Sequence, residues 1–286
     1  MAFLVLSIVL NSFIFALFKL FGLKNVNTFH AIVANYFVCV ITGTLFTGLN
    51  HVLDQPNNAT WIYIALVLGA IFIVIFYLMA LTAQKFSMAA SSIASKMAFV
   101  LPVLFSLFVL RVESNFVWYN YIGIGLALIA TYMSSATSSS HVVVGNKYLW
   151  LLPVFVFLGN GIIDTTINYT NLNFIDESTV KVFPIYIFLS AAVIGGIVLL
   201  IQGERVTYKS MVAGGVLGII NYFTVFAFLK ALAQLNNNGA FVFPIFNTGI
   251  VVLSALIGLI VFREKLSTLN KVGVIMAILA IALVMY

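Results

Sequence analysis

Apolar stretches of about 20 residues recur along the whole chain, and they constrain its fold more than any other feature. A helix of that length rises far enough to cross a hydrocarbon core of ~30 Å. Ten such stretches can be delimited, at residues 2–21, 29–49, 60–82, 88–110, 116–134, 148–169, 179–201, 210–232, 239–262 and 268–286. The sequence therefore predicts an all-α integral membrane protein with ten transmembrane helices, located in the cell membrane.

The composition supports this prediction, because 63% of the 286 residues are hydrophobic and only 7% are charged. So few charges could not cover the surface of a soluble domain of this size. The longest connections are 50–59 and 135–147, so no soluble domain is expected. The first stretch has neither a basic n-region nor an A-x-A site, which favours a retained helix over a signal peptide.

Motifs that mark several enzyme and pump classes are missing from the sequence. It contains no G-x-x-x-x-G-K-[ST], no H-E-x-x-H and no G-x-S-x-G. His30, His51 and His141 are widely separated, and the single Cys39 cannot form a disulfide within the chain. We expect a protein that is not an enzyme and that has no cofactor, no metal site and no nucleic-acid partner. Its net charge of +6 is explained by lysine and arginine in the loops.

The chain also repeats itself at an offset of about 150 residues. The segment GIGLALIATYM (123–133) aligns with GVIMAILAIAL (273–283), which places Gly123 on Gly273 and two alanines on two alanines. Polar residues keep nearly the same offset, in the pairs Asn11/Asn160, Gln84/Gln234, Arg111/Arg263 and Glu113/Glu264. Chance agreement between helices of similar composition accounts for the alanines but poorly for the polar pairs. We expect a first repeat at 1–134, a linker at 135–147 and a second repeat at 148–286.

Each repeat holds five apolar stretches, and this odd number has a topological consequence. The second repeat enters the bilayer from the side opposite to the first, so the two are inverted about an axis in the membrane plane. Secondary transporters commonly have this architecture, with the substrate site near the midplane between the repeats.

The five-plus-five arrangement resembles the drug/metabolite transporter superfamily, in its EamA-like branch. The resemblance is sharpest in FREKLSTLNKVGVIMAILAIALVM (262–285) and LRVESNFVWYNYIGIGLALIATYM (110–133). Members typically end spans four and nine with an acidic residue and open the next span around a glycine, positions filled here by Glu113, Glu264, Gly123 and Gly273. The chain departs from the family in having Val-Glu and Arg-Glu where Gly-Glu is frequent. The resemblance implies solute transport without ATP, commonly export of amino acids or metabolites, and leaves the substrate open.

One lysine interrupts the fourth apolar stretch. Lys96 lies ~12 Å along this helix, a depth from which its side chain can snorkel to the interface, bind a carbonyl at a helix end or face a polar cavity. Three features favour the cavity: neighbouring serines such as Ser95, the equivalent position of Asn247 in span nine, and Pro102. Because proline has no N–H, Pro102 is expected to leave the carbonyl of Ala98 without its usual donor.

The sixth stretch carries the densest polar stripe. Asn160, Asp164 and Asn168 are spaced i, i+4 and i+8 and so share one helix face. Asp164 is the only acidic residue inside any of the ten stretches. Asn11 in span one and Asn221 in span eight are further candidates for a substrate site. For any single asparagine, hydrogen bonding between helices is the alternative interpretation.

The relation between Lys96 and Asp164 stays open at this stage. Counted from the same side, Lys96 lies ~12 Å and Asp164 ~24 Å into the membrane. An uncertainty of a few residues in the boundaries would allow a direct ion pair. The nominal separation suits instead the two ends of a bound zwitterion, or one charge for the substrate and one for a coupling proton.

The loops divide unevenly in charge. One side holds Lys19, Lys24, Lys85, Lys147, Arg205, Lys209, Arg263, Lys265 and Lys271, and the other holds Arg111, Lys181 and Lys230. The positive-inside rule then favours termini outside the cell, whereas the family resemblance implies cytoplasmic termini. The orientation stays open.

Three functional hypotheses compete. The first is a secondary transporter that exports a small polar or amphoteric metabolite, such as an amino acid, by alternating access with or without proton coupling. The second is a structural or assembly membrane protein, and the third an intramembrane enzyme acting on a lipid-linked substrate. The expected partners are the small-molecule substrate and the lipid bilayer, with the chain as a monomer or homodimer.

Overall fold

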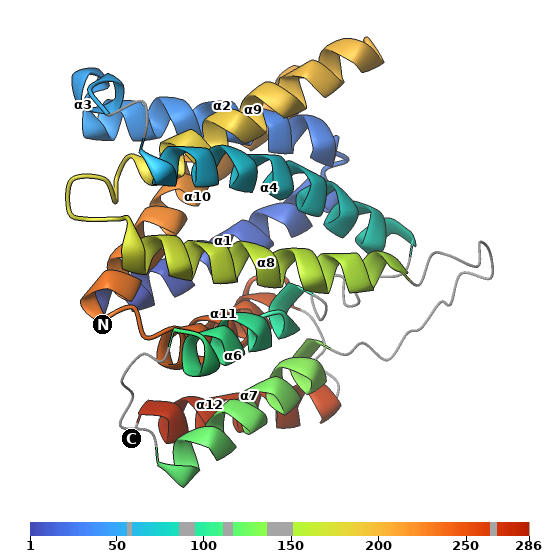
Figure 1. Ribbon diagram of the computed structural model, residues 1–286. Coiled ribbons are helices and arrows are strands. Elements are labelled where there is room, and N and C mark those ends of the chain that lie inside the picture. The colour runs from blue at the N-terminus through green and yellow to red at the C-terminus, as the bar shows by residue number, and fades with distance from the viewer. Residues whose placement is uncertain (56–58, 86–94, 111–116, 136–150, 264–267, 286) are drawn as a thin grey trace. The chain divides into compact units, whose positions relative to one another are not determined.

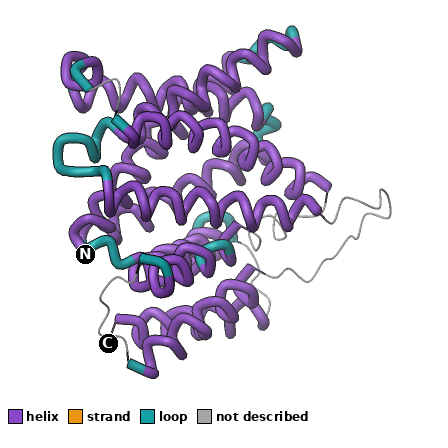
Figure 2. Tube along the Cα trace, in the orientation of Figure 1, coloured by secondary structure: helices purple, strands orange, loops and turns teal. Residues whose placement is uncertain are grey.

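The computed structural model describes every residue except 56–58, 86–94, 111–116, 136–150, 264–267 and 286 (Figure 1). The described residues form helices and connecting loops and no β-strand, as Figure 2 shows by colour. The main helices are α1 (Ala2–Leu23), α2 (Thr28–Thr47), α4 (Thr60–Lys85), α6 (Val100–Phe108), α7 (Trp118–Ser135), α8 (Leu151–Asn173), α9 (Phe183–Gln202), α10 (Tyr208–Gln234), α11 (Gly239–Ile260) and α12 (Thr268–Met285). A short helix, α3 (Leu49–Leu53), follows α2.

Six of these helices are long and apolar enough to cross a membrane. They are α1, α2, α4, α9, α10 and α11, and shorter apolar helices lie at Ser95–Phe108, Trp118–Ala130 and Lys271–Val284. Where the structure describes them, the predicted apolar stretches coincide with helices to within a few residues. The all-helical fold is therefore confirmed for the described residues, with six helices that could span a membrane. Most of the predicted linker 135–147, together with Arg111, Glu113 and Glu264, lies outside the described residues.

Asparagine caps determine where two helices begin. Asn27 precedes α2 and accepts a hydrogen bond from the backbone N–H of His30, and Asn238 accepts one from Phe241 at the start of α11. The asparagine run at 236–238 thus caps span nine, as such residues commonly do. At the other end of a helix, Gly203 terminates α9 in the left-handed region, with φ of 65°.

The fourth span bends just before its proline. Residues 98 and 99 form a turn between the residues around Lys96 and the start of α6. Here the backbone N–H of Leu101 donates to the carbonyl oxygen of Ala98 over 3.0 Å. Pro102 has no N–H to offer this carbonyl, and the backbone tightens by one residue so that Leu101 replaces the usual donor.

The chain forms two compact units that do not follow the order of the sequence. Unit 1 contains 1–74 and 169–234, and unit 2 contains 75–168 and 235–286. Each unit takes segments from both predicted repeats, and α4 and α8 each contribute one part to unit 1 and another to unit 2. The units are therefore distinct from the repeats, which remain a prediction about the sequence.

Unit 1 is organised around α2, which packs against α9 and α10, while α1 packs against α10. Glycines permit two of its helix contacts. A Cβ on Gly218 of α10 would lie 2.6 Å from the carbonyl oxygen of Asn35 and 2.7 Å from the Cβ of Val38, both on α2. A Cβ on Gly69 of α4 would likewise lie 2.3 Å from a carbonyl oxygen of α9, that of Ile187. The backbones approach more closely here than any larger residue would allow.

Unit 2 is organised around the pair α7 and α12, which lie side by side, and around α11, which packs against α6, α7 and α12 (Figure 1). The alanines that the repeat alignment superposes, Ala127, Ala130, Ala277 and Ala280, are all buried. A Cβ placed on Gly123 of α7 would lie 3.0 Å from the backbone nitrogen of Val284 on α12, so the two helices are close here. Asn120 also donates from its side chain to the carbonyl oxygen of Leu283, over 3.0 Å.

Candidate functional site

Lys96 lies inside unit 2 and not at its surface. Only 7% of the residue is exposed, and its Nζ lies 6.0 Å from the centroid of the Phe246 ring on α11. An ammonium at this distance from an aromatic ring is attracted by the ring's quadrupole. The lysine is therefore held among side chains of the helix bundle rather than directed at the surface.

Asp164 is half-buried on α8 and interacts electrostatically with Lys96. A glycine brings its helix close to the fourth span: a Cβ on Gly161 would lie 2.1 Å from the Leu101 side chain. An ion taken from water into an apolar interior loses several kcal/mol of hydration, and the attraction between the two opposite charges offsets part of that loss. Unit 2 therefore holds a cation and a carboxylate within electrostatic reach.

Asn168 continues the polar stripe of α8 to a fully buried position. Its exposed fraction is 0%, and neither its Nδ2 nor its Oδ1 has a hydrogen-bond partner among the described residues. The side chain fits against Gly239 at the start of α11, where a Cβ would lie 2.4 Å from Nδ2. A buried polar group without a partner costs about 1–3 kcal/mol, so this amide requires an explanation.

The remaining predicted residues of unit 2 have local partners. Asn160 is half-buried, and its amide donates to the carbonyl oxygen of Val156 over 2.8 Å and approaches the sulfur of Met79 at 3.8 Å. Asn247 is buried on α11 and donates to the carbonyl oxygen of Phe243. In both cases the side-chain nitrogen donates to a backbone carbonyl of the residue's own helix. The side-chain oxygen can still accept a hydrogen bond.

Asn11 and Asn221 belong to unit 1, whereas the other five candidates belong to unit 2. Asn221 donates to the side-chain oxygen of Asn35 over 3.2 Å, and Cys39 donates to that same oxygen and to the carbonyl of Gly218. These bonds join α2 to α10, so the interpretation as a link between helices accounts for Asn221. Asn11 is half-buried on α1.

Sequence reasoning missed some residues of unit 2. The ring of Phe246 was not identifiable, because the 27 phenylalanines of the chain give no sign of which one faces a charge. Thr248 is completely buried, and its hydroxyl has no hydrogen-bond partner among the described residues. Its position beside Asn247 was the available signal.

The side chains brought together in unit 2 include groups that can bind opposite charges. An ammonium, a carboxylate and several amide groups lie on α8, on α11 and in the segment before α6, and each kind of group complements one part of an amphoteric molecule. Among the described residues, no three His, Cys, Asp or Glu side chains come together as metal ligands would.

Comparison with known proteins gives the fold and little more. No family model matches the chain. A protein of Haemophilus influenzae, described as an uncharacterized protein, is 25% identical over 296 aligned positions, which cover 99% of this chain and 97% of that protein. A solved crystal structure, described only as that of a protein, matches with a TM-score of 0.74 at 15% identity, over 99% of this chain and 94% of its own. The whole chain therefore has a fold that is also found in a crystal structure.

Proposed function

We propose that the protein is a secondary transporter that moves a small amphoteric metabolite, such as an amino acid, across the cell membrane by alternating access, in the direction of export. The observation that carries the proposal is the buried Lys96, within Coulombic reach of Asp164, in a helix bundle that includes α11, one of the six helices apolar enough to cross a membrane. Ionisable residues at membrane depth usually mark a substrate or ion pathway, because their desolvation must be offset by a function or a partner.

Helix pairing supports an inverted five-plus-five repeat as part of this proposal. If α1 to α7 correspond in order to α8 to α12, with α3 set aside, then α2 packs against its counterpart α9, α6 against α11, and α7 against α12. Helices next to a twofold axis meet their own counterparts in this way. The close approach of Gly69 to α9 matches that of Gly218 to α2, as equivalent positions would.

The glycine pair gives a test of the repeat that is independent of transport. Gly69→Ala and Gly218→Ala each force a Cβ against a backbone carbonyl, so both should lower the free energy of unfolding by a similar amount, about 1–3 kcal/mol. Detergent-to-SDS unfolding titrations of the two variants measure it. A cost confined to one of them would argue against equivalent positions.

The proposed mechanism assigns one charge to each end of the solute. The Lys96 ammonium binds the carboxylate of the substrate, and Asp164 binds its amino group or carries a coupling proton. The buried amide of Asn168 supplies a donor and an acceptor that a bound solute satisfies. Movement of the helices then exposes this site to one side of the membrane at a time.

Flux measurements test the proposal. The protein is reconstituted in liposomes, and uptake is measured from a mixture of radiolabelled amino acids, with Lys96→Gln and Asp164→Asn as variants. Losing a hydrogen bond to a charged group costs roughly 1.5–3 kcal/mol, so Lys96→Gln should weaken apparent affinity about 10- to 150-fold. Lys230→Gln is the control, because it removes an equal charge from an exposed ion pair with Glu177.

The outcomes separate the three hypotheses. Flux that falls in the two site variants but not in Lys230→Gln supports transport. If the parent and all variants are folded but none of them moves a solute, the result favours a structural protein in which the polar groups join helices. Chemical conversion of a lipid-linked compound without vectorial movement would identify an enzyme.

A further inference from the structure

A groove in unit 1 lies between the end of α1 and the start of α10, and it shares no residue with the candidate site. It encloses about 420 Å³, within the ~300–1,000 Å³ range of small-molecule pockets. Phe21, only 3% exposed, lies at its floor, and Leu20, Val212 and Val216 are exposed along its walls. Because these residues belong to helices that are apolar enough to cross a membrane, the apolar walls of the groove suit an acyl chain.

Two lysines stand at the mouth of the groove. Lys24 directly follows α1, and Lys209 is the second residue of α10; both line the groove and both are exposed. The ammonium of Lys209 donates to the backbone carbonyl oxygen of Lys24. This bond uses one of the three N–H donors of the Lys209 ammonium and holds that charge next to Lys24, which carries the other.

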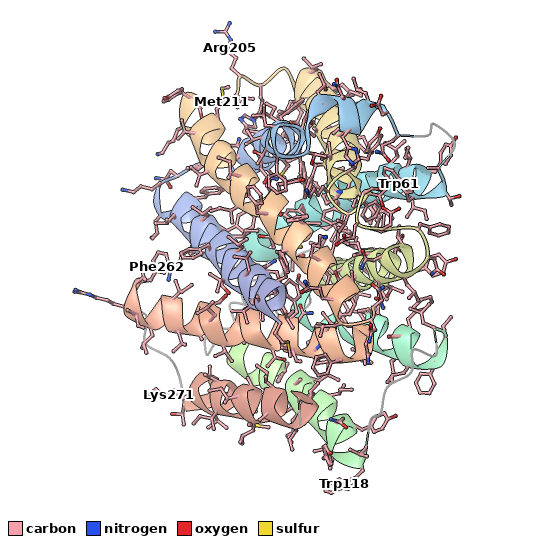
Figure 3. All side chains as sticks on the ribbon, turned by 90° about the vertical axis from the view of Figure 1, so that its left-hand side faces the viewer. Trp61, Trp118, Arg205, Met211, Phe262 and Lys271 are labelled. Atoms are coloured by element: carbon pink, nitrogen blue, oxygen red, sulfur yellow. The ribbon has the colours of Figure 1, made fainter. Side chains whose placement is uncertain are left out.

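The surrounding charges reinforce a preference for an anion. This end of unit 1 carries Lys19, Lys24, Arg205 and Lys209 against one acid, Glu204, which is paired with His30 over 2.9 Å. Figure 3 shows Arg205 extending outward near the start of α10, where Met211 also lies. The opposite helix ends of unit 1 carry Asp54, Asp176 and Glu177 with only Lys181 and Lys230.

The geometry points to a binding site for one anionic phospholipid, with an acyl chain in the groove and the phosphate between Lys24 and Lys209. Both lysines lie at helix ends, the depth at which lipid phosphates are found. The exposed Tyr208 beside them is of the type that collects at this interface. A lipid with a net negative headgroup complements the two ammonium groups, whereas a choline headgroup brings a third cation to the same place.

Native mass spectrometry of the full chain tests the site. The purified protein is titrated with dioleoyl phosphatidylglycerol and, separately, with dioleoyl phosphatidylcholine, which have the same chains and different headgroup charge. We expect the first to bind more tightly to the unmodified protein. A lysine near anionic lipid contributes about 1 kcal/mol, so Lys24→Gln with Lys209→Gln should weaken the first lipid about 25-fold.

Two further variants separate charge from shape. Arg263→Gln with Lys271→Gln removes the same two charges from exposed positions elsewhere, so it should leave binding unchanged. Val216→Trp fills the groove without altering any charge, so it should weaken binding of both lipids. Circular dichroism checks that each variant keeps its helices, and Lys24→Gln alone replaces the double variant if that one does not fold.

The proposal is overturned if the two lipids bind the unmodified protein equally. It is also overturned if the groove variants lose no more affinity than the control pair. A third refuting result would be a protein dimer that forms without lipid and that Val216→Trp disrupts, because the groove would then bind a second copy of the chain.

Discussion

Two adjacent glycines on α10 allow a sharp test of how closely the helices of unit 1 approach. A Cβ on Gly214 would lie 2.4 Å from the carbonyl oxygen of Ala31 and 2.6 Å from the Cβ of Ala34, both on α2. A Cβ on Gly215 would have no neighbouring atom within 4 Å. Gly214→Ala should therefore destabilise the protein, and Gly215→Ala should not.

The size of the difference follows from these distances. Ordinary van der Waals contact begins near 3.4 Å, so a methyl group added at Gly214 would require the two backbones to separate by about 1 Å. Overpacking of this kind costs about 1–3 kcal/mol. Both variants gain the same helix propensity of up to ~1 kcal/mol. The difference between their free energies of unfolding then isolates the packing cost, at about 1–3 kcal/mol.

Equilibrium unfolding in mixed micelles, with helicity followed by circular dichroism, measures both values under the same conditions. Gly214→Ala should also strain the bond from Cys39 to the Gly218 carbonyl, because separation of α2 and α10 lengthens it from 3.2 Å. Faster alkylation of the Cys39 thiol in this variant would report that strain. Equal free energies for the two variants would refute the close approach of these helices.

Two more predictions concern single side chains. Gly239→Ala should lower the free energy of unfolding by about 1–3 kcal/mol in the same titration, because its Cβ meets the side chain of Asn168. Adding Asn168→Ala should recover part of this loss, and no recovery would contradict the contact. Donors from Ser178 and Thr179 lower the pKa of the loop residue Asp176 from 3.8 to about 2. Because the pKa is lowered in the folded state, the stabilisation is complete above about pH 4 and is lost as the pH falls toward 2. Melting temperatures across this range should fall more in the parent than in Asp176→Asn, and parallel curves would count against the carboxylate's role.

The helices could be predicted from the sequence because the signal is local and redundant. Nearly every residue of a run such as 60–82 is apolar, so an error of a few positions leaves the α4 prediction intact. The turn at residues 98 and 99 could not be predicted in the same way. Proline marks the region, yet whether a carbonyl is left open or satisfied by a tighter turn depends on backbone adjustments that no residue type specifies.

The candidate site was predictable in its composition but not in its arrangement. The i, i+4, i+8 spacing of Asn160, Asp164 and Asn168 places them on one face of any α-helix. Which helices pack around that face depends on glycines such as Gly161 and Gly239, whose neighbours lie far away in the sequence. The contact of Lys96 with Phe246 is of this second kind. Asn221 was a candidate for binding the solute, but its side chain instead donates a hydrogen bond to Asn35 on another helix. The sequence alone does not distinguish these two roles.

The interleaving of the two units has a consequence for biosynthesis. Unit 1 includes the two helices that come first in the sequence, yet α2 packs against α9 and α10, and α10 ends only at Gln234. At about 5–20 residues per second, translation from the end of α2 to the end of α10 takes roughly 10 to 40 s. During that interval Asn35 and Cys39 lack the partners on α10 that they have in the finished fold. The packing of α2 in unit 1 can therefore be completed only after α10 has been synthesised, late in translation.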